Sequence, residues 1–92
     1  MVNPDVIFLA AQHTPEIEAG CNDCIANTMK LNAAMVPWAA ANTTAASPII
    51  LVDLFTGLDT TTDFSDGVHL NVAGAEIVSD RWLAALLPIL KP

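Results

Sequence analysis

The chain has 92 residues and a formal net charge of −7, from ten acidic and three basic side chains. This charge argues against a basic surface for nucleic acid, so no nucleic-acid partner is expected. Although 53% of the residues are apolar, no apolar run reaches the roughly 20 residues of a membrane span. So apolar a composition in so short a chain indicates a buried part of a larger domain.

The first expected element is a strand over residues 6–11, a continuous apolar run flanked by Pro4 and Pro15. Unbroken apolar runs with β-branched residues are typical of strands buried on both faces of a parallel sheet. His13 then lies in the loop that leaves the carboxyl end of this strand. Because α/β folds build their sites at that edge, His13 is a candidate residue of a substrate cleft.

Cys21 and Cys24 are the two cysteines of the chain. A Cys-x-x-Cys pair can be a redox motif, half of a zinc site or a short structural disulfide. A four-thiolate zinc site needs a second pair, which one chain does not supply. The preceding acidic residues, Glu16 and Glu18, would raise a thiolate pKa. We therefore predict a local disulfide, with free thiols as the next alternative and redox or metal chemistry after that.

A helix is expected to begin at Asn22 or Asp23, either of which can act as a side-chain cap, and to run toward Ala41. Pro37 lies inside this pattern and is expected to kink or end the helix near residues 33–36. The buried stripe is expected to comprise three large apolar residues at helical spacing: Leu31, Met35 and Trp38.

Asn42-Thr43-Thr44 has the pattern of an N-glycosylation acceptor, which makes Asn42 a candidate glycosylation site. A polar connector leads from there to a second apolar strand over residues 49–54. Asp53 near its end is expected to accept hydrogen bonds from loop backbone. A strand, a long helix and another strand make a βαβ unit with parallel strands.

A loop over residues 55–66 is rich in Thr and Asp, and a final helix is expected over residues 72–87. Gly74 near its start permits a close approach, and Pro88 is expected to end the helix. Its apolar stripe is expected to contain Val78, Trp82, Ala85 and Ile89. The order β-α-β-α predicts an α/β fold, but two strands are too few for a stable parallel sheet.

The stretch Ser65-Asp66-Gly67-Val68-His69-Leu70-Asn71 carries the chemistry. Gly67 allows a turn that other residues adopt poorly, and Asn71 can cap the helix that follows. Asp66 and His69, three positions apart, can then act as the orienting and proton-transfer members of a Ser-His-Asp triad.

This stretch resembles the last motif of the SGNH, or GDSL, hydrolases, in which an Asp-x-x-His precedes a small-residue helix start. Within that family the chain resembles secreted fungal acetylesterases that act on plant polysaccharides. The resemblance runs from Pro4 to Pro88 and covers the C-terminal half of the family's domain. The family more often has Pro after the His, where this chain has Leu70; the difference touches the helix start and leaves the chemistry alone.

The resemblance implies that residues 1–92 are the C-terminal part of one flavodoxin-like three-layer α/β/α domain, incomplete without its N-terminal half. It implies a serine ester hydrolase that deacetylates carbohydrates or other small esters, with Asp66 and His69 as catalytic residues and no cofactor. The expected partners are the missing N-terminal half or a second copy of the chain. The family also implies secretion, although residues 1–4 lack the basic segment and cleavage site of a signal peptide.

The family takes its nucleophile and oxyanion hole from earlier motifs that this sequence does not contain. Its three serines, Ser47, Ser65 and Ser79, are each better explained as structural residues. The isolated chain is therefore expected to be inactive. The alternative interpretation is a non-catalytic fragment or interaction module. Asp59, Asp63 and Asp66 lack the tighter spacing and the bidentate Glu of a calcium loop, so no metal site is expected.

Overall fold

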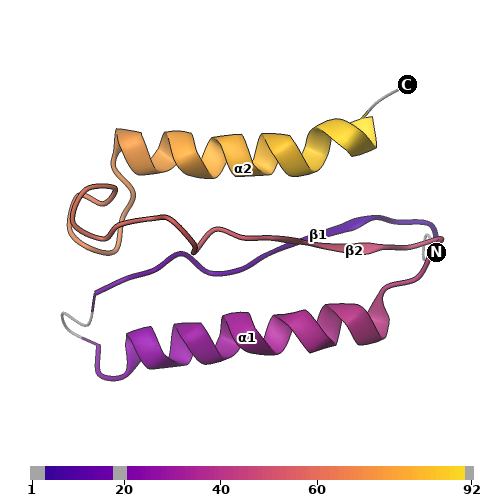
Figure 1. The fold of residues 1–92 in the computed structure, drawn as a ribbon, viewed down its shortest axis with the longest axis horizontal. Helices are drawn as coiled ribbons and strands as arrows, with labels where there is room; N and C mark the ends of the chain where they lie inside the picture. The colour runs from indigo at the N-terminus through magenta and orange to yellow at the C-terminus, as the bar shows by residue number, and fades with distance from the viewer. Residues whose placement is uncertain (1–3, 18–20, 91–92) are drawn as a thin grey trace.

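The computed structural model describes residues 4–17 and 21–90. Its elements follow the order β1 (Phe8–Ala11), α1 (Cys24–Asn42), β2 (Ile49–Val52) and α2 (Val72–Leu90). The two strands form the middle layer, with α1 on one face of the sheet and α2 on the other (Figure 1). The predicted α/β unit is confirmed. No helix in the described part of the chain is long and apolar enough to cross a bilayer.

The two strands pair in parallel, with Phe8 opposite Ile49 and Ala11 opposite Val52. This confirms the predicted βαβ unit. Each strand is shorter than the sequence predicts, and burial on both faces is wrong for β1, because Phe8 remains 51% exposed. The physical reason is that each strand of a two-stranded sheet is an edge strand.

Helix α1 begins directly after Asp23, as expected, but the capping prediction is wrong in its mechanism. Asp23 has a left-handed backbone conformation with φ 64° and makes no side-chain capping hydrogen bond. Of the two effects expected of Pro37, ending the helix is wrong, because α1 continues to Asn42; the kink stays a prediction. A proline removes one helical N–H, and a helix of 19 residues retains enough other hydrogen bonds to continue past it.

The buried face of α1 differs from the predicted stripe. Leu31 is 54% exposed and Trp38 is 49% exposed, whereas Thr28, Asn32 and Ala39 are buried. The large apolar side chains lie one position away from the face that packs on the sheet. Together with β1 they line a groove of about 450 Å³ that has only apolar side chains: Ala10, Leu31, Ala34, Met35 and Trp38.

Helix α2 begins as predicted. The Asn71 side chain accepts a hydrogen bond from the backbone N–H of Gly74 at 3.0 Å, which satisfies one of the free donors of the first turn. Gly74 is buried, and an added Cβ would overlap the carbonyl oxygen of Asp63. The prediction that Pro88 ends the helix is wrong, since α2 continues to Leu90. Pro88 lies in the last turn, where only two residues follow it in the helix, so the hydrogen bond that it removes does not prevent the helix from reaching Leu90.

The core of the described chain is formed by α1, β2 and the loop that follows β2. Its most buried apolar residues are Ala39, Val52, Leu54, Leu58 and Phe64. The predicted inner stripe of α2, Val78, Trp82, Ala85 and Ile89, is half-buried. The loop between β2 and α2 therefore contributes three of these core residues: Leu54, Leu58 and Phe64.

Candidate active site

The loop that carries Asp66 and His69 is closed by its own backbone. Phe64 and Leu70 form an antiparallel bridge. The N–H of Ser65 donates to the carbonyl of His69 at 2.8 Å, and the N–H of Asn71 donates to that of Asp63 at 3.0 Å. These bonds hold the residues between Ser65 and His69 in one tight turn, whose positive φ of 83° falls on Gly67, as the sequence predicts.

Asp66 and His69 are brought together inside this turn. The Asp66 Oδ2 atom lies 2.6 Å from the Nδ1 atom of His69. The other carboxylate oxygen accepts the backbone N–H groups of Val68 at 2.9 Å and His69 at 2.7 Å. An ionised carboxylate accepts only, so Nδ1 carries the proton and Nε2 is left as an acceptor. The His69 side chain is 78% exposed.

The same contacts set the electrostatics of the pair. Hydrogen bonds from the backbone and then the ring of His69, followed by the Val68 N–H, hold the pKa of Asp66 far below its ordinary value. Hydrogen bonds to the charged form of a carboxylate favour that form. The lowered pKa therefore keeps Asp66 ionised under more acidic conditions than an ordinary aspartate.

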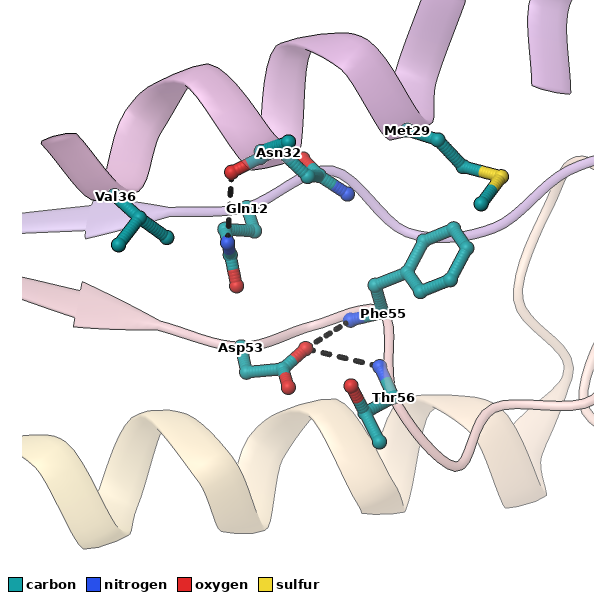
Figure 2. Close-up of a pocket in the computed structure, with 8 residues that line it drawn as sticks. Gln12, Met29, Asn32, Val36, Asp53, Phe55 and Thr56 are labelled. Carbon is teal, nitrogen blue, oxygen red and sulfur yellow. Dashed lines mark hydrogen bonds between the residues drawn. The ribbon is translucent and has the colours of Figure 1, made fainter. Parts of the chain in front are cut away.

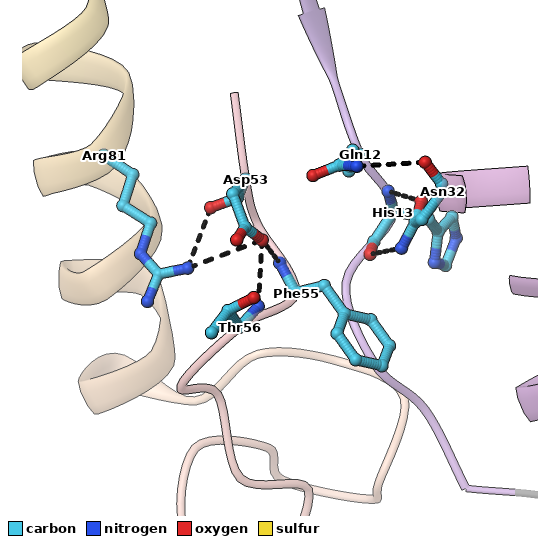
Figure 3. Close-up of polar contacts among 7 residues, drawn as sticks. All are labelled: Gln12, His13, Asn32, Asp53, Phe55, Thr56 and Arg81. Atoms are coloured by element: carbon cyan, nitrogen blue, oxygen red, sulfur yellow. Dashed lines mark hydrogen bonds and ion pairs between the residues drawn. The ribbon is translucent and has the colours of Figure 1, made fainter. Parts of the chain in front are cut away.

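The loop after β1 is fixed to α1 by a buried amide. Asn32 accepts the backbone N–H of His13 at 2.7 Å and donates to the His13 carbonyl at 3.0 Å (Figure 3). The His13 ring is exposed and its Nδ1 lies 2.7 Å from the carbonyl of Thr14. His13 thus lies at the carboxyl end of β1, as predicted; its place in a substrate cleft stays a prediction.

A second polar cluster follows β2. The carboxylate of Asp53 accepts the N–H groups of Phe55 at 2.8 Å and Thr56 at 2.9 Å, as the sequence predicts. Arg81 of α2 donates to the Asp53 carbonyl at 2.8 Å. Burial alone would raise the pKa of Asp53, but the bonds from Thr56 and Phe55, with the charge of Arg81, lower it. Asp53 therefore fixes the exit of β2 against α2 (Figure 3).

Between these two clusters lies a cavity of about 210 Å³ at the carboxyl ends of the strands. Figure 2 shows α1 above it and the turn of Asp53, Phe55 and Thr56 below. Gln12 donates from its side chain to the carbonyl of Asn32 at 3.0 Å across this space. At the opposite wall the Asp53 carboxylate accepts the N–H groups of Phe55 and Thr56, so hydrogen-bonded side chains from both strand ends line the cavity (Figure 2).

The serines have structural contacts. The backbone N–H of Ser47 donates to Thr44, and its hydroxyl donates to the carbonyl of Val6. The Ser65 hydroxyl lies 3.2 Å from the carbonyl of His69 rather than at the ring. Ser79 is an exposed residue within α2. Each position agrees with the structural explanation given from the sequence.

The remaining candidate residues are placed as follows. Cys21 and Cys24 form a close pair with Cα atoms 5.6 Å apart, a separation that a disulfide spans. Asn42 is exposed at the end of α1, with its side-chain amide donating to the Trp38 carbonyl at 2.8 Å. The carboxylates of Asp59 and Asp63 accept backbone N–H groups within their own loop.

Two solved structures match 95% of this chain, each at 25% sequence identity. One is a carbohydrate esterase family 3 structure from Talaromyces cellulolyticus, with a TM-score of 0.80. The fold is that of part of a carbohydrate esterase family 3 enzyme. The other is an acetyl esterase with a serine-to-alanine mutation and an acetate ion, with a TM-score of 0.81. No family model matches the sequence, and no curated protein matches it.

The chain spans 41% of the length of each of these esterase structures. The likeness confirms the SGNH-type fold expected from the Asp66-to-Asn71 motif. Sequence reasoning missed three residues with contacts near this turn: Ile17, which donates to Gly67, and Thr28 and Asn32, which bind the loop after β1. The available signal was two polar residues one helical turn apart, Thr28 and Asn32, on the face of α1 that would pack on the sheet.

Proposed function

We propose that the chain is the C-terminal part of a serine ester hydrolase that removes acetyl groups from carbohydrates. Its contribution is the pair of Asp66 and His69. The observation that carries this proposal is the 2.6 Å contact between Asp66 Oδ2 and His69 Nδ1, in a histidine whose side chain is 78% exposed. The likeness to an acetyl esterase and a carbohydrate esterase supports the substrate class.

In the proposed reaction His69 Nε2 takes the proton from a serine hydroxyl as that hydroxyl attacks the acetyl carbonyl. The imidazolium formed is stabilised by the ionised Asp66, and Nε2 then returns the proton to the leaving sugar hydroxyl. Water attacks the acetyl-enzyme by the same route and releases acetate. The hydrogen bonds that lower the pKa of Asp66 keep it charged throughout this cycle.

The nucleophile and the oxyanion hole belong to the N-terminal part of the domain. We propose that this part pairs with the free edge of β1 and covers the apolar groove formed by Ala10, Leu31, Ala34, Met35 and Trp38. The groove and the free strand edge lie on the same side of the described fold, since Ala10 belongs to β1. A further parallel strand with its helix has the shape to fill both.

Secretion follows from the same assignment. The close pair of Cys21 and Cys24 is proposed to be a disulfide, which persists in an oxidising compartment. Asn42 is exposed, so an oligosaccharyltransferase could reach it. It lies at the end of α1 nearest the start of β2, away from the loop that carries His69 (Figure 1), where a glycan would leave the site open.

The test is hydrolysis of an aryl acetate by this chain alone and with a complementing fragment. The fragment is the portion of the Talaromyces cellulolyticus esterase that the chain does not span. We expect negligible turnover by the lone chain, because each missing oxyanion donor is worth about 10²–10³-fold in rate. We expect turnover by the pair, which His69→Ala abolishes and the exposed α2 control Asp80→Asn leaves intact.

Turnover by the lone chain that survives His69→Ala would place the chemistry elsewhere and refute the proposal. The alternative, an interaction module without catalysis, is favoured only by the exposed apolar groove. The two interpretations differ in the activity of the complex: in the alternative, the complementing fragment would bind the chain, yet the complex would show no esterase activity.

A further inference from the structure

Ile17, in the loop after β1, is bonded to the turn that carries the Asp-His pair. Its backbone N–H donates to the carbonyl of Gly67 at 3.0 Å. Its side chain lies over the same glycine, since a Cβ added at Gly67 would be 2.5 Å from two Ile17 side-chain carbons. Gly67 is thus held both by a hydrogen bond and by packing.

The Gly67 carbonyl and the Val68 N–H belong to one peptide unit, which is planar. The carbonyl end accepts from Ile17, and the N–H end donates to Asp66 Oδ1 at 2.9 Å. A rotation of this unit would break both bonds together. Such a rotation takes place about ψ of Gly67 and φ of Val68, and glycine populates several backbone regions at little cost.

Ile17 is in turn held by α1 through the loop that precedes it. The Thr28 hydroxyl donates to Glu16 at 2.7 Å, one residue before Ile17. Asn32, one helical turn further, holds both backbone groups of His13. Thr28 and Asn32 are both buried. The loop after β1 is therefore hydrogen-bonded both to α1 and to the turn of Gly67.

We propose that Ile17 is a positioning residue for the Asp66–His69 pair. By fixing the Gly67–Val68 peptide, it fixes the donor that holds Asp66 and so the carboxylate that orients the His69 ring. The consequence for catalysis rests on the proposed function; the consequence for the geometry of the pair does not.

The test is NMR of the isotope-labelled 92-residue chain, comparing Ile17→Ala, the conservative Ile17→Val and the matched control Ile89→Ala. Ile89 is a half-buried isoleucine of α2, remote in sequence from this turn. The readouts are the tautomer of His69, from long-range ¹H–¹⁵N correlations, and the exchange rate of the Val68 amide. We expect Ile17→Ala to lose the predominance of the Nδ1–H tautomer and the control to keep it.

Val68 amide exchange is expected to be roughly two- to tenfold faster in Ile17→Ala, the effect of weakening one hydrogen bond. Ile17→Val keeps Cβ and both γ-carbons and is expected to preserve the tautomer. An unchanged tautomer with unchanged Val68 exchange in a folded Ile17→Ala would overturn the proposal. If circular dichroism shows that Ile17→Ala is unfolded, the test uses Ile17→Val with Ile89→Val as its control. The proposal then requires faster exchange of the Val68 amide in Ile17→Val than in Ile89→Val. Equal exchange rates overturn it.

In the complemented esterase, Ile17→Ala is expected to lower kcat by about 10²-fold, the effect of a small misplacement of a catalytic group. KM should change little, because the pair acts on the transition state. If no variant, including the parent chain, shows esterase activity, the proposed function fails while the NMR comparison still decides the role of Ile17.

Discussion

Asp66 holds His69 twice. One carboxylate oxygen lies 2.6 Å from the ring Nδ1, and the other lies 2.7 Å from the backbone N–H of the same histidine. The ring and the backbone of His69 are thus bonded to the same carboxylate. This restricts the side-chain torsions of His69 even though the ring is exposed to solvent. An orienting carboxylate normally acts on the ring alone; here it also shapes the turn.

Asp66→Asn is expected to reduce kcat of the complemented esterase by about 10⁴-fold, as the same change does in a serine protease triad. The amide of Asn would present a donor to Nδ1 and favour the opposite tautomer, leaving Nε2 unable to accept a proton. Asp80→Asn on the exposed face of α2 is the matched control. Equal activity of the two variants would remove Asp66 from the proposed mechanism.

The contribution of Asp66 to stability should depend on pH in one direction. Its pKa is depressed in the folded chain, so the contribution is complete above the ordinary value of about 3.9 and is lost as pH falls below it. Acid unfolding of the parent chain and Asp66→Asn should therefore converge at low pH and differ near neutrality.

His69→Ala refines this prediction, because it removes the ring contact and keeps the backbone N–H. The first cause of the low pKa is the backbone bond of His69. The pKa of Asp66 in His69→Ala should rise and still lie below the ordinary value. Carboxyl-carbon NMR titration measures it; an ordinary pKa in this variant would show that the ring, and not the turn, holds the carboxylate.

The motif from Asp66 to Asn71 could be predicted because its geometry is local. A glycine with positive φ and a capping asparagine are properties of a few adjacent residues, and both are confirmed. The contacts of Ile17 and Asn32 could not be predicted from the sequence, since these contacts depend on where the fold places the loop after β1. Local propensity carries no information about those contacts.

The errors on α1 have a related cause. Periodicity marked Leu31 and Trp38 as buried because large apolar residues at helical spacing usually face a core. Here that face lies along the edge of the sheet, and the polar Thr28 and Asn32 face inward. Thr28 donates to the Glu16 carboxylate, and Asn32 binds the backbone of His13. Periodicity identifies an apolar face correctly but does not say whether this chain supplies its cover.

Gly74→Ala should destabilise the chain, although the same change in an exposed helix stabilises by up to about 1 kcal/mol. The added Cβ would overlap the carbonyl of Asp63, a backbone atom held by the N–H of Asn71. Overpacking of this kind costs about 1–3 kcal/mol. Urea unfolding measures it, with the exposed helical Ala75→Gly as the reversed control. A gain in stability for Gly74→Ala would mean that the loop yields.

Cys21 and Cys24 are expected to contain no free thiol in unreduced, denatured protein. A bridge across so short a loop removes little chain entropy, so reduction should lower the free energy of unfolding by only about 1–2 kcal/mol. Thiol titration gives the count, and a paired Cys21→Ser and Cys24→Ser variant gives the energy. Two titratable thiols in the unreduced chain would contradict the disulfide.

The lone chain is expected to associate, because its apolar groove and the free edge of β1 lie together. The backbone N–H groups of Phe8 and Gln12 donate toward β2, so those of Leu9 and Ala11 point to the open edge. An open edge beside exposed Leu31 and Trp38 is a surface that monomers rarely leave uncovered. Light scattering at micromolar concentration should therefore give a mass above that of the monomer.

Two leucines of almost equal exposure allow a test of whether association depends on the groove or on any exposed apolar residue. Leu31 in the groove is 54% exposed and Leu83 on α2 is 52% exposed. Leu31→Lys places a charge in the groove and should shift the chain toward monomer, and it should also weaken binding of the complementing fragment. Leu83→Lys adds the same charge elsewhere and should do neither. Equal effects of the two substitutions on association would show that association does not depend on the groove. A parent chain that is monomeric and melts cooperatively would show that the strand edge and the groove need no cover.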